Sequence, residues 1–402
     1  MTTEASAVVV GPSPAPGRAF LAPLLLTLAL FGPSSTNGAI APSIVLAWSG
    51  VAILLFVSPV VLGRAPFRPG GLWFGAAGLS VLALATVVSP FNQLAPGAVL
   101  PYAAAFAMMA FRAGDLPLGR GTARWLSLAN VVLLVVGGFI VAGDERVRAW
   151  VVQWYAVVYE DLVPNMTGWR KPVFSFGSHS TAAFAYYLLF LLQWEDFRRN
   201  ASRWALVLAL LNAAMSLALT SAAAVGFAGL TVVRLAAAGR RQLWVWAVAS
   251  LVVAAAVVAA SDLLGPFSLE EALRLAFGAD DGGFRGRYLS GGTIAGSLSY
   301  IAQYPLRPVG LSYSTEVFYG DSGPVEQLLR GSVPLVVLVY GALVCWIRTE
   351  VRDAGHRRQL LVAVLLFELG FSALTFFRFA LLLPFVVAYL NYVSARRAPA
   401  HA

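Results

Sequence analysis

Apolar stretches of roughly 15 to 22 residues recur along almost the whole chain, and each is long enough for a helix that crosses a lipid bilayer. Several are short, which a bundle of helices tolerates. The pattern predicts an all-α, polytopic integral membrane protein with about 12 transmembrane helices, at residues 18–33, 41–63, 71–89, 95–111, 125–143, 178–194, 204–220, 222–238, 243–261, 332–348, 359–376 and 379–395.

The basic residues of the connecting loops support this count, because short cytoplasmic loops carry more Arg and Lys than outer loops do. If the amino terminus is cytoplasmic, the inner segments hold 18 of the 28 Lys and Arg residues and six of the 19 acids. The outer loops hold ten basic residues and twelve acids. We therefore predict that both termini lie in the cytoplasm.

The spans form a single transmembrane domain at residues 18–395. The small-residue, Pro-rich segment at 1–17 is typical of a disordered cytoplasmic lead-in rather than a cleavable signal. Residues 396–402 form a cytoplasmic tail. Two outer loops are long, at 144–177 and 262–331, so any chemistry is expected there and above all in the second.

The first long loop has Val147, Val151, Trp154 and Val158 on one helical face, which predicts a helix lying in the membrane interface.

The second long loop carries its own helical signals. Ser268 with Glu271 three residues later forms a capping-box pattern. The apolar spacing from Ile294 to Ile301 predicts a helix that stops before Pro305, because a proline disfavours helical backbone at the residue before it. This loop is therefore expected to be structured.

Composition agrees with a membrane protein, since 59% of the residues are hydrophobic, 12% are charged and the mean hydropathy is +0.76. The net charge of +9 and the pI near 10 follow from basic inner loops. No basic run with interleaved aromatic residues indicates a nucleic-acid partner. The single cysteine, Cys345, cannot form an intramolecular disulfide or a thiolate cluster for a metal.

Basic groups dominate the candidates for chemistry in the long outer loops. Several Arg side chains that converge near the interface suit a diphosphate or another multiply charged anion, because guanidinium groups pair bidentately with phosphate oxygens. The alternative is that each Arg extends to the lipid headgroups or pairs with a nearby acid, such as Asp280, Asp281 or Glu316.

The segment at residues 284–341 resembles the signature region of the bacterial O-antigen ligase and polymerase superfamily. Arg287, or Arg285, matches the leading arginine of that region. Tyr304, Pro305 and Leu306 with Gly310 match its turn, Asp321 and Ser322 match its polar pair, and Gly331 and Ser332 occupy the entry to the next span. The segments GWRKPVFSFGSHSTAAFAYYLLFLL and SLALTSAAAVGFAGL are similar to other parts of the same superfamily.

The departures from the superfamily pattern affect the assignment. Pro308 stands where glycine is common, the distance from Arg287 to Pro305 is longer than usual, and Ala222 replaces a frequent Arg. Asp321 replaces the His that marks ligases, which favours a polymerase.

The resemblance implies a glycosyltransferase of the GT-C-like architecture at the outer face of the bacterial inner membrane. The donor would be an oligosaccharide on a polyprenyl diphosphate, and the acceptor would be a glycan, with membrane lipid and a chain-length regulator as further partners. Neither a metal nor a cofactor is expected, because diphosphate is already a good leaving group and arginines neutralise its charge.

The same resemblance, together with the chemistry of the reaction, implies a role for each candidate residue. Asp321 is expected to act as general base for the acceptor hydroxyl, and Arg287 as the catalytic cation. The donor diphosphate is then expected to bind Arg170, Lys171, Arg285 and Arg307. Further candidates are His179, Glu326 and Arg378.

Structural interpretations compete for several of these residues. His179 at the mouth of a span could cap it. Glu368 and Arg378 lie in or beside late spans, where they would line a path for lipid or glycan or form a structural ion pair. His356 is expected to be cytoplasmic and idle.

Three other classes remain as alternatives. A polyprenyl-phosphate-sugar transferase would carry metal-binding acids in its first outer loop, but PSSTNGAIAPS contains none. An O-antigen ligase, transferring glycan to lipid A core, shares the signature region. A flippase or transporter of lipid-linked oligosaccharide fits the twelve spans, but it would place charges and broken helices at mid-membrane.

Overall fold

The computed structural model describes residues 21–32, 50–51, 53–56, 68–95, 98–116, 118–155, 170–176, 178–219, 294–313 and 322–395. These residues are helical apart from loops and one antiparallel pair of two-residue strands, β1 (Gln93–Leu94) with β2 (Ser312–Tyr313). The helices are α2 (Leu21–Phe31), α4 (Pro69–Val87), α5 (Val99–Ala110), η2 (Ala113–Asp115), α6 (Arg120–Ala142), α7 (Glu145–Tyr155), η3 (Phe174–Phe176), α9 (His179–Asn200), α10 (Arg203–Ala218), α15 (Ala295–Gln303), α16 (Gly323–Glu350), α17 (Ala354–Glu368) and α18 (Phe377–Ala395).

Apolar side chains cover the outside of the bundle as well as its core. On α6 the exposed large apolar residues follow each other at alternating steps of three and four, and so form one continuous stripe along the helix: Trp125, Leu128, Val132, Val135 and Phe139. A stripe of this length is not left to water in a soluble protein. The fold is that of an all-α membrane protein.

The described residues do not show twelve spans. Four of their helices are long and apolar enough to cross a membrane: α4, α6, α16 and α18. Helices α2, α5 and α10 are apolar but have only 10–17 residues, and α9 has 22 residues but ends in the charged sequence QWEDFRRN. The predicted spans 222–238 and 243–261 lie outside the described residues, as does most of 41–63.

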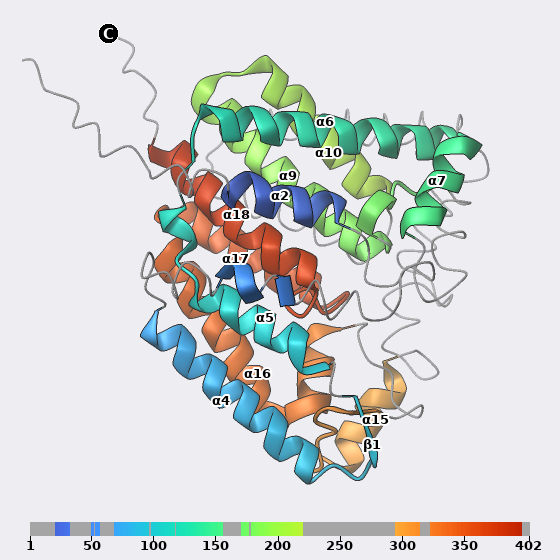
Figure 1. The fold of residues 1–402 in the computed structure, drawn as a ribbon, viewed down its shortest axis with the longest axis vertical. Coiled ribbons are helices and arrows are strands. Elements are labelled where there is room, and N and C mark those ends of the chain that lie inside the picture. The colour runs from blue at the N-terminus through green and yellow to red at the C-terminus, as the bar shows by residue number, and fades with distance from the viewer. Residues whose placement is uncertain are drawn as a thin grey trace, which may run out of the picture.

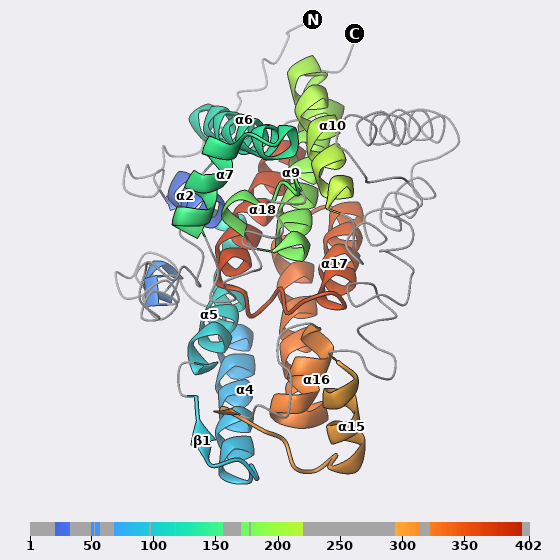
Figure 2. The ribbon, with the colours of Figure 1, turned by 90° about the vertical axis from the view of Figure 1, so that its right-hand side faces the viewer.

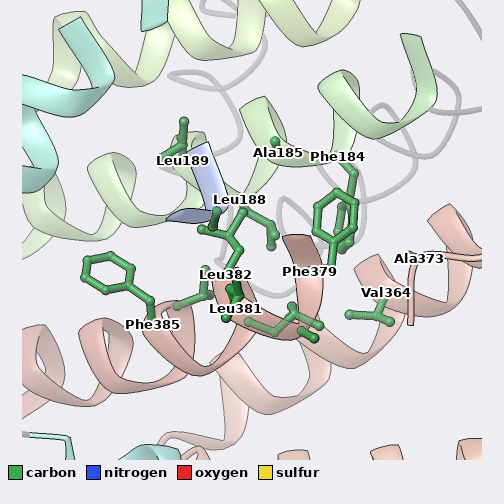
Figure 3. Packing of buried hydrophobic residues seen from close by; sticks show 14 of the residues in the cluster. Phe184, Ala185, Leu188, Leu189, Val364, Ala373, Phe379, Leu381, Leu382 and Phe385 are labelled. Atoms are coloured by element: carbon green, nitrogen blue, oxygen red, sulfur yellow. The ribbon is translucent and has the colours of Figure 1, made fainter. Parts of the chain in front are cut away.

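Helix α18 forms the centre of the bundle and contacts α2, α5 and α9. Its side of the core is aromatic: Phe184 of α9 stacks on Phe367 of α17 at 4.5 Å and lies 4.6 Å from Phe379 of α18 between ring centroids. Figure 3 shows Phe184 and Leu188 facing Phe379 and Leu382 across this interface. Close packing of this kind holds α9, α17 and α18 together as one body.

The helices run roughly side by side, and α7 and α15, which come from the two long loops, lie at the same end of them but far from each other (Figures 1 and 2). In Figure 1, α7, α15 and β1 all lie at the right-hand ends of the helices. The 90° view separates α7 from α15 along the long axis, with α7 beside α6 and α15 beside α16 (Figure 2). Helix α15 ends at Gln303, two residues before Pro305, as the proline predicts.

Candidate functional site

Helix α16 begins nine residues earlier than the predicted span at 332–348, and it is kinked where that span was expected to begin. Gly323 and Pro324 open the helix, since proline suits its first turn. The backbone leaves helical geometry at Gly331 (φ −144°, ψ 16°) and Ser332 (φ 54°, ψ −161°). Pro334 explains the break, because its ring excludes the carbonyl four residues earlier, that of Arg330.

The loop that follows α15 satisfies the carbonyls that the kink releases. The N–H of Val309 donates to the carbonyl of Leu329 at 2.8 Å, and the N–H of Gly310 donates to that of Arg330 at 2.9 Å. The φ of +61° at Gly310 suits glycine. The loop after α15 is therefore fastened to the kink by main-chain hydrogen bonds.

The short helical segment before the kink, residues 323–330, carries a buried ion pair. Arg330 Nε lies 3.0 Å from Glu326 Oε1, and Arg330 Nη1 donates to the carbonyl of Gly310 at 3.0 Å. The hydroxyl of Ser372 donates to the second carboxylate oxygen of Glu326. Hydrogen bonds to both carboxylate oxygens offset part of the cost of burying this pair.

A second buried carboxylate, Glu368, lies at the end of α17 against the start of α16. It accepts hydrogen bonds from the Tyr340 hydroxyl at 2.7 Å and from the Leu374 N–H at 2.6 Å. Among the described residues, no basic side chain lies within ion-pair distance of it. Helix α16 approaches so closely that a side chain on residue 323 would collide with Glu368 Oε2.

Next to these acids, three buried side chains have polar atoms that make no hydrogen bond. They are the Tyr102 hydroxyl, both polar atoms of the Gln327 amide and the Ser322 hydroxyl, in side chains at most 2% exposed. Tyr102 lies beside Gln327 and close enough to Glu326, Arg330 and Glu368 to feel their charges. The orientation of its hydroxyl does not allow a hydrogen bond of normal geometry to the Gln327 amide.

Each buried polar group left without a partner costs about 1–3 kcal/mol, so bound water or ligand hydroxyls are expected here. We call the whole set the α16 polar cluster: Tyr102, Ser322, Glu326, Gln327, Arg330, Tyr340, Glu368 and Ser372. Its donors and acceptors suit a ligand rich in hydroxyl groups.

The length of α16 indicates how deep this cluster lies. At the opposite end of the helix, Glu350 pairs with Arg68, the residue before α4, at 2.6 Å. From the kink to Glu350 there are 18 helical residues, 333–350, which span roughly 27 Å at 1.5 Å per residue. That is close to the thickness of a bilayer's hydrocarbon core, roughly 30 Å. The kink therefore marks one boundary of the span, and Glu326 and Arg330 lie at that boundary.

The two predicted catalytic residues, Asp321 and Arg287, lie outside the described residues, as does Arg285. Asp321 directly precedes Ser322 in the sequence, the first described residue of the α16 polar cluster in this part of the chain. Glu326, a further candidate, is found inside the cluster.

The other predicted cations do not converge. Arg170 and Lys171 lie between α7 and η3, whereas Arg307 follows α15, and these elements lie far apart along the long axis in both views (Figures 1 and 2). Arg307 is exposed and lies over the Tyr304 ring, 6.0 Å from its centroid.

Arg170 and Lys171 have different surroundings although they are adjacent. The Arg170 guanidinium lies over Gly143, the residue that ends α6, where a helix C-terminus favours positive charge. Lys171 is buried, and burial lowers the pKa of its amine from 10.5 to about 8.

Arg378 contacts a helix end, and no acid of the described residues pairs with it. Its guanidinium donates from Nη1 to the carbonyl of Ala29 at 2.9 Å and from Nη2 to that of Gly32, both at the C-terminus of α2. The hydroxyls of Ser175 and Tyr155 donate to the two carbonyls between them. Arg378 therefore caps α2, and its role in a path for lipid or glycan stays a prediction.

The structure corrects one histidine interpretation and places a second histidine. Helix α9 is capped by Ser178, whose hydroxyl accepts from the N–H of Thr181 at 3.3 Å, and not by His179, its first residue. His356, expected to be idle, is buried and lies 3.0 Å from Glu195. It links α17 to α9 at the end opposite the α16 polar cluster.

Sequence reasoning missed Tyr102, Gln327, Tyr340 and Ser372. A signal was present, because each polar side chain stands in or beside an apolar stretch, and such residues usually face the interior of a bundle. In the described part of the chain, no group of three or more His, Cys, Asp or Glu side chains could hold a metal ion. No family model, curated protein or solved structure matches this chain.

Proposed function

We propose that this protein is a polysaccharide polymerase of the O-antigen or exopolysaccharide type. It transfers glycan from a polyprenyl-diphosphate-linked donor to an acceptor glycan, at the outer face of a bacterial inner membrane and without a metal. The proposal includes the full count of twelve spans, a GT-C-like architecture and cytoplasmic termini.

The observation that carries this proposal is the α16 polar cluster. It joins two buried carboxylates and an arginine with three side chains whose polar atoms have no hydrogen bond of normal geometry, at the boundary of a span and directly after Asp321 in the sequence. Amide, phenol and hydroxyl groups recognise sugar hydroxyls by donating and accepting hydrogen bonds. A transferase that acts on a lipid-linked glycan needs such hydrogen-bonding groups at the membrane boundary, where the sugar meets its lipid carrier.

In the proposed reaction, Gln327, Tyr102 and Ser322 hold hydroxyl groups of the glycan. The acceptor oxygen forms a bond to the anomeric carbon of the donor sugar while the bond from that carbon to the diphosphate breaks. The diphosphate leaves with the bonding electrons, next to Arg287, and the acceptor proton passes to Asp321. Glu326 holds Arg330 and thereby fastens the loop at Gly310.

A transporter of lipid-linked glycan is the second candidate, and the broken helix α16 favours it. Transporters place broken helices and ionisable residues near the middle of the membrane. Here the break is followed by 18 helical residues, roughly 27 Å. The break therefore lies near a membrane boundary, and the transferase fits this position better.

Purified protein incubated with lipid-linked oligosaccharide in the presence of a metal chelator tests the proposal. A polymerase produces a ladder of longer glycans on the lipid. A single glycan added to lipid A core would identify a ligase, and movement across vesicles without bond formation would identify a transporter. Asp321→Asn and Arg287→Ala should each abolish the ladder, while Arg307→Lys should retain it.

A further inference from the structure

Two helices place the loop after α15 at a membrane boundary, independently of the proposed reaction. The ion pair between Arg68 and Glu350 joins the start of α4 to the end of α16 in one plane. From that plane, α4 runs for 19 residues to Val87, and α16 runs back for 18 residues to Ser332. Both lengths correspond to roughly 27–29 Å, about one hydrocarbon thickness.

The loop is attached to both of these helix ends. The hydroxyl of Ser332 donates to the carbonyl of Pro305 at 3.1 Å, at the kink of α16. The N–H of Leu311 donates to the hydroxyl of Thr86 at 2.8 Å, in the last turn of α4. The loop from Pro305 to Leu311 therefore lies at the same depth as the two helix ends.

The loop is closely held, yet it exposes its apolar side chains. The Tyr300 hydroxyl donates to the carbonyl of Arg307 at 3.0 Å, and the N–H of Arg307 donates to the carbonyl of Tyr304 at 3.0 Å. Even so, Leu306 is 87% exposed and Tyr304 is 44% exposed. A fixed turn that presents a leucine outward needs an apolar environment to cover it.

We infer that Tyr304, Leu306 and Arg307 form an anchor that inserts into the headgroup layer of the bilayer. Leu306 enters the outermost part of the acyl chains, the Tyr304 ring lies at the headgroup level, and Arg307 pairs with phospholipid phosphate. An aromatic ring, an aliphatic side chain and an arginine are the groups that membrane interfaces favour. The positive charge of Arg307, over the Tyr304 ring, complements the lipid phosphates.

Depth-dependent quenching tests this anchor in the full-length protein. In a Cys345→Ala background, Leu306→Cys and Val337→Cys are each labelled with an environment-sensitive fluorophore and reconstituted into phosphatidylcholine and phosphatidylglycerol vesicles. Val337 is exposed on α16, five residues beyond the kink and so roughly 7 Å deeper.

The label at position 306 should lose fluorescence mainly to lipid whose nitroxide lies near the glycerol. The label at position 337 should lose it mainly to lipid whose nitroxide lies near the middle of the acyl chain. Arg307→Glu should reduce the shallow quenching at position 306, and Arg307→Lys should preserve it.

Quenching at position 306 by aqueous iodide alone would overturn the inference, as would protection from every quencher by a second copy of the chain. Equal quenching in Arg307→Glu and Arg307→Lys would overturn the part assigned to Arg307. None of these readouts involves glycan transfer. A negative result in the polymerase assay therefore does not count against the anchor, and a negative quenching result does not count against the proposed polymerase.

Discussion

The Oε2 atom of Glu368 occupies the space that a side chain on Gly323 would need. The two residues come from different helices, and their contact brings the start of α16 against the end of α17. Because Tyr340 and Leu374 hold the same carboxylate, it cannot move aside without losing hydrogen bonds. The shape of the α16 polar cluster therefore depends on a glycine at position 323.

Gly323→Ala should displace Glu368 and destabilise the fold by about 1–3 kcal/mol, the usual cost of adding a methyl group to a packed site. Thermal unfolding in detergent measures this loss. Gly296→Ala is the matched control, because a Cβ there meets no atom within 4 Å. Equal unfolding temperatures for the two variants would show that the helices do not approach as closely as described.

Removal of the Arg378 guanidinium should loosen α2. Arg378→Gln loses charged hydrogen bonds to two carbonyls of a buried helix end, each contributing about 1.5–3 kcal/mol. We expect a lower unfolding temperature and faster proteolysis near residue 32. Arg378→Lys keeps the charge, but a single ammonium group cannot bond both carbonyls as the planar guanidinium does. Its unfolding temperature should therefore lie between those of wild type and Arg378→Gln. A Gln variant as stable as wild type would contradict the cap.

Lys171 is the only lysine of the chain, so its titration can be observed alone. Selective ¹³C labelling of lysine should give one side-chain NMR signal with a midpoint near pH 8, because burial lowers the pKa of the amine to about 8. A midpoint near 10.5 would mean that the amine is solvated.

The same pKa shift predicts how stability depends on pH. Between about pH 8 and 10.5 the unfolded chain holds the Lys171 proton and the folded chain does not, so stability should rise with pH in this window. Below pH 8 the cost of burying the charge is present in full. Lys171→Met should lack the rise, and parallel pH profiles for Lys171→Met and wild type would contradict the shift.

Hydrophobic pattern alone predicted the helical membrane class and several helix positions. The predicted span 125–143 appears within α6 (Arg120–Ala142), and the stop before Pro305 appears at the end of α15. These features depend on residues close together in sequence, so the local sequence is enough to predict them. Single Gly and Pro residues, such as Gly143 after α6, mark the boundaries reliably.

Contacts between residues far apart in the sequence could not be predicted from local patterns. Arg378 caps carbonyls that lie 346 and 349 residues earlier, and no local pattern indicates that partner. Residues 323–330 belong to the predicted loop 262–331, whereas in the structure they form the start of α16. Only the mutual pairing of Glu326 and Arg330 and the contacts with Ser372 and Gly310 make these two residues buried. The proline at position 324 was the one local sign of the helix start.

Replacement of Gln327 tests the central claim, that the α16 polar cluster binds glycan, most directly. Gln327 is buried and its amide has no hydrogen-bond partner, so Gln327→Leu should keep or raise the unfolding temperature. Gln359→Leu is the matched control, since Gln359 is a buried amide bonded to Tyr187 at the other end of the bundle. The measurement is elongation of lipid-linked glycan by each purified variant, alongside its unfolding temperature. The account predicts a stable Gln327→Leu protein with a severe loss of elongation and an active Gln359→Leu protein, whereas full elongation by Gln327→Leu would contradict it.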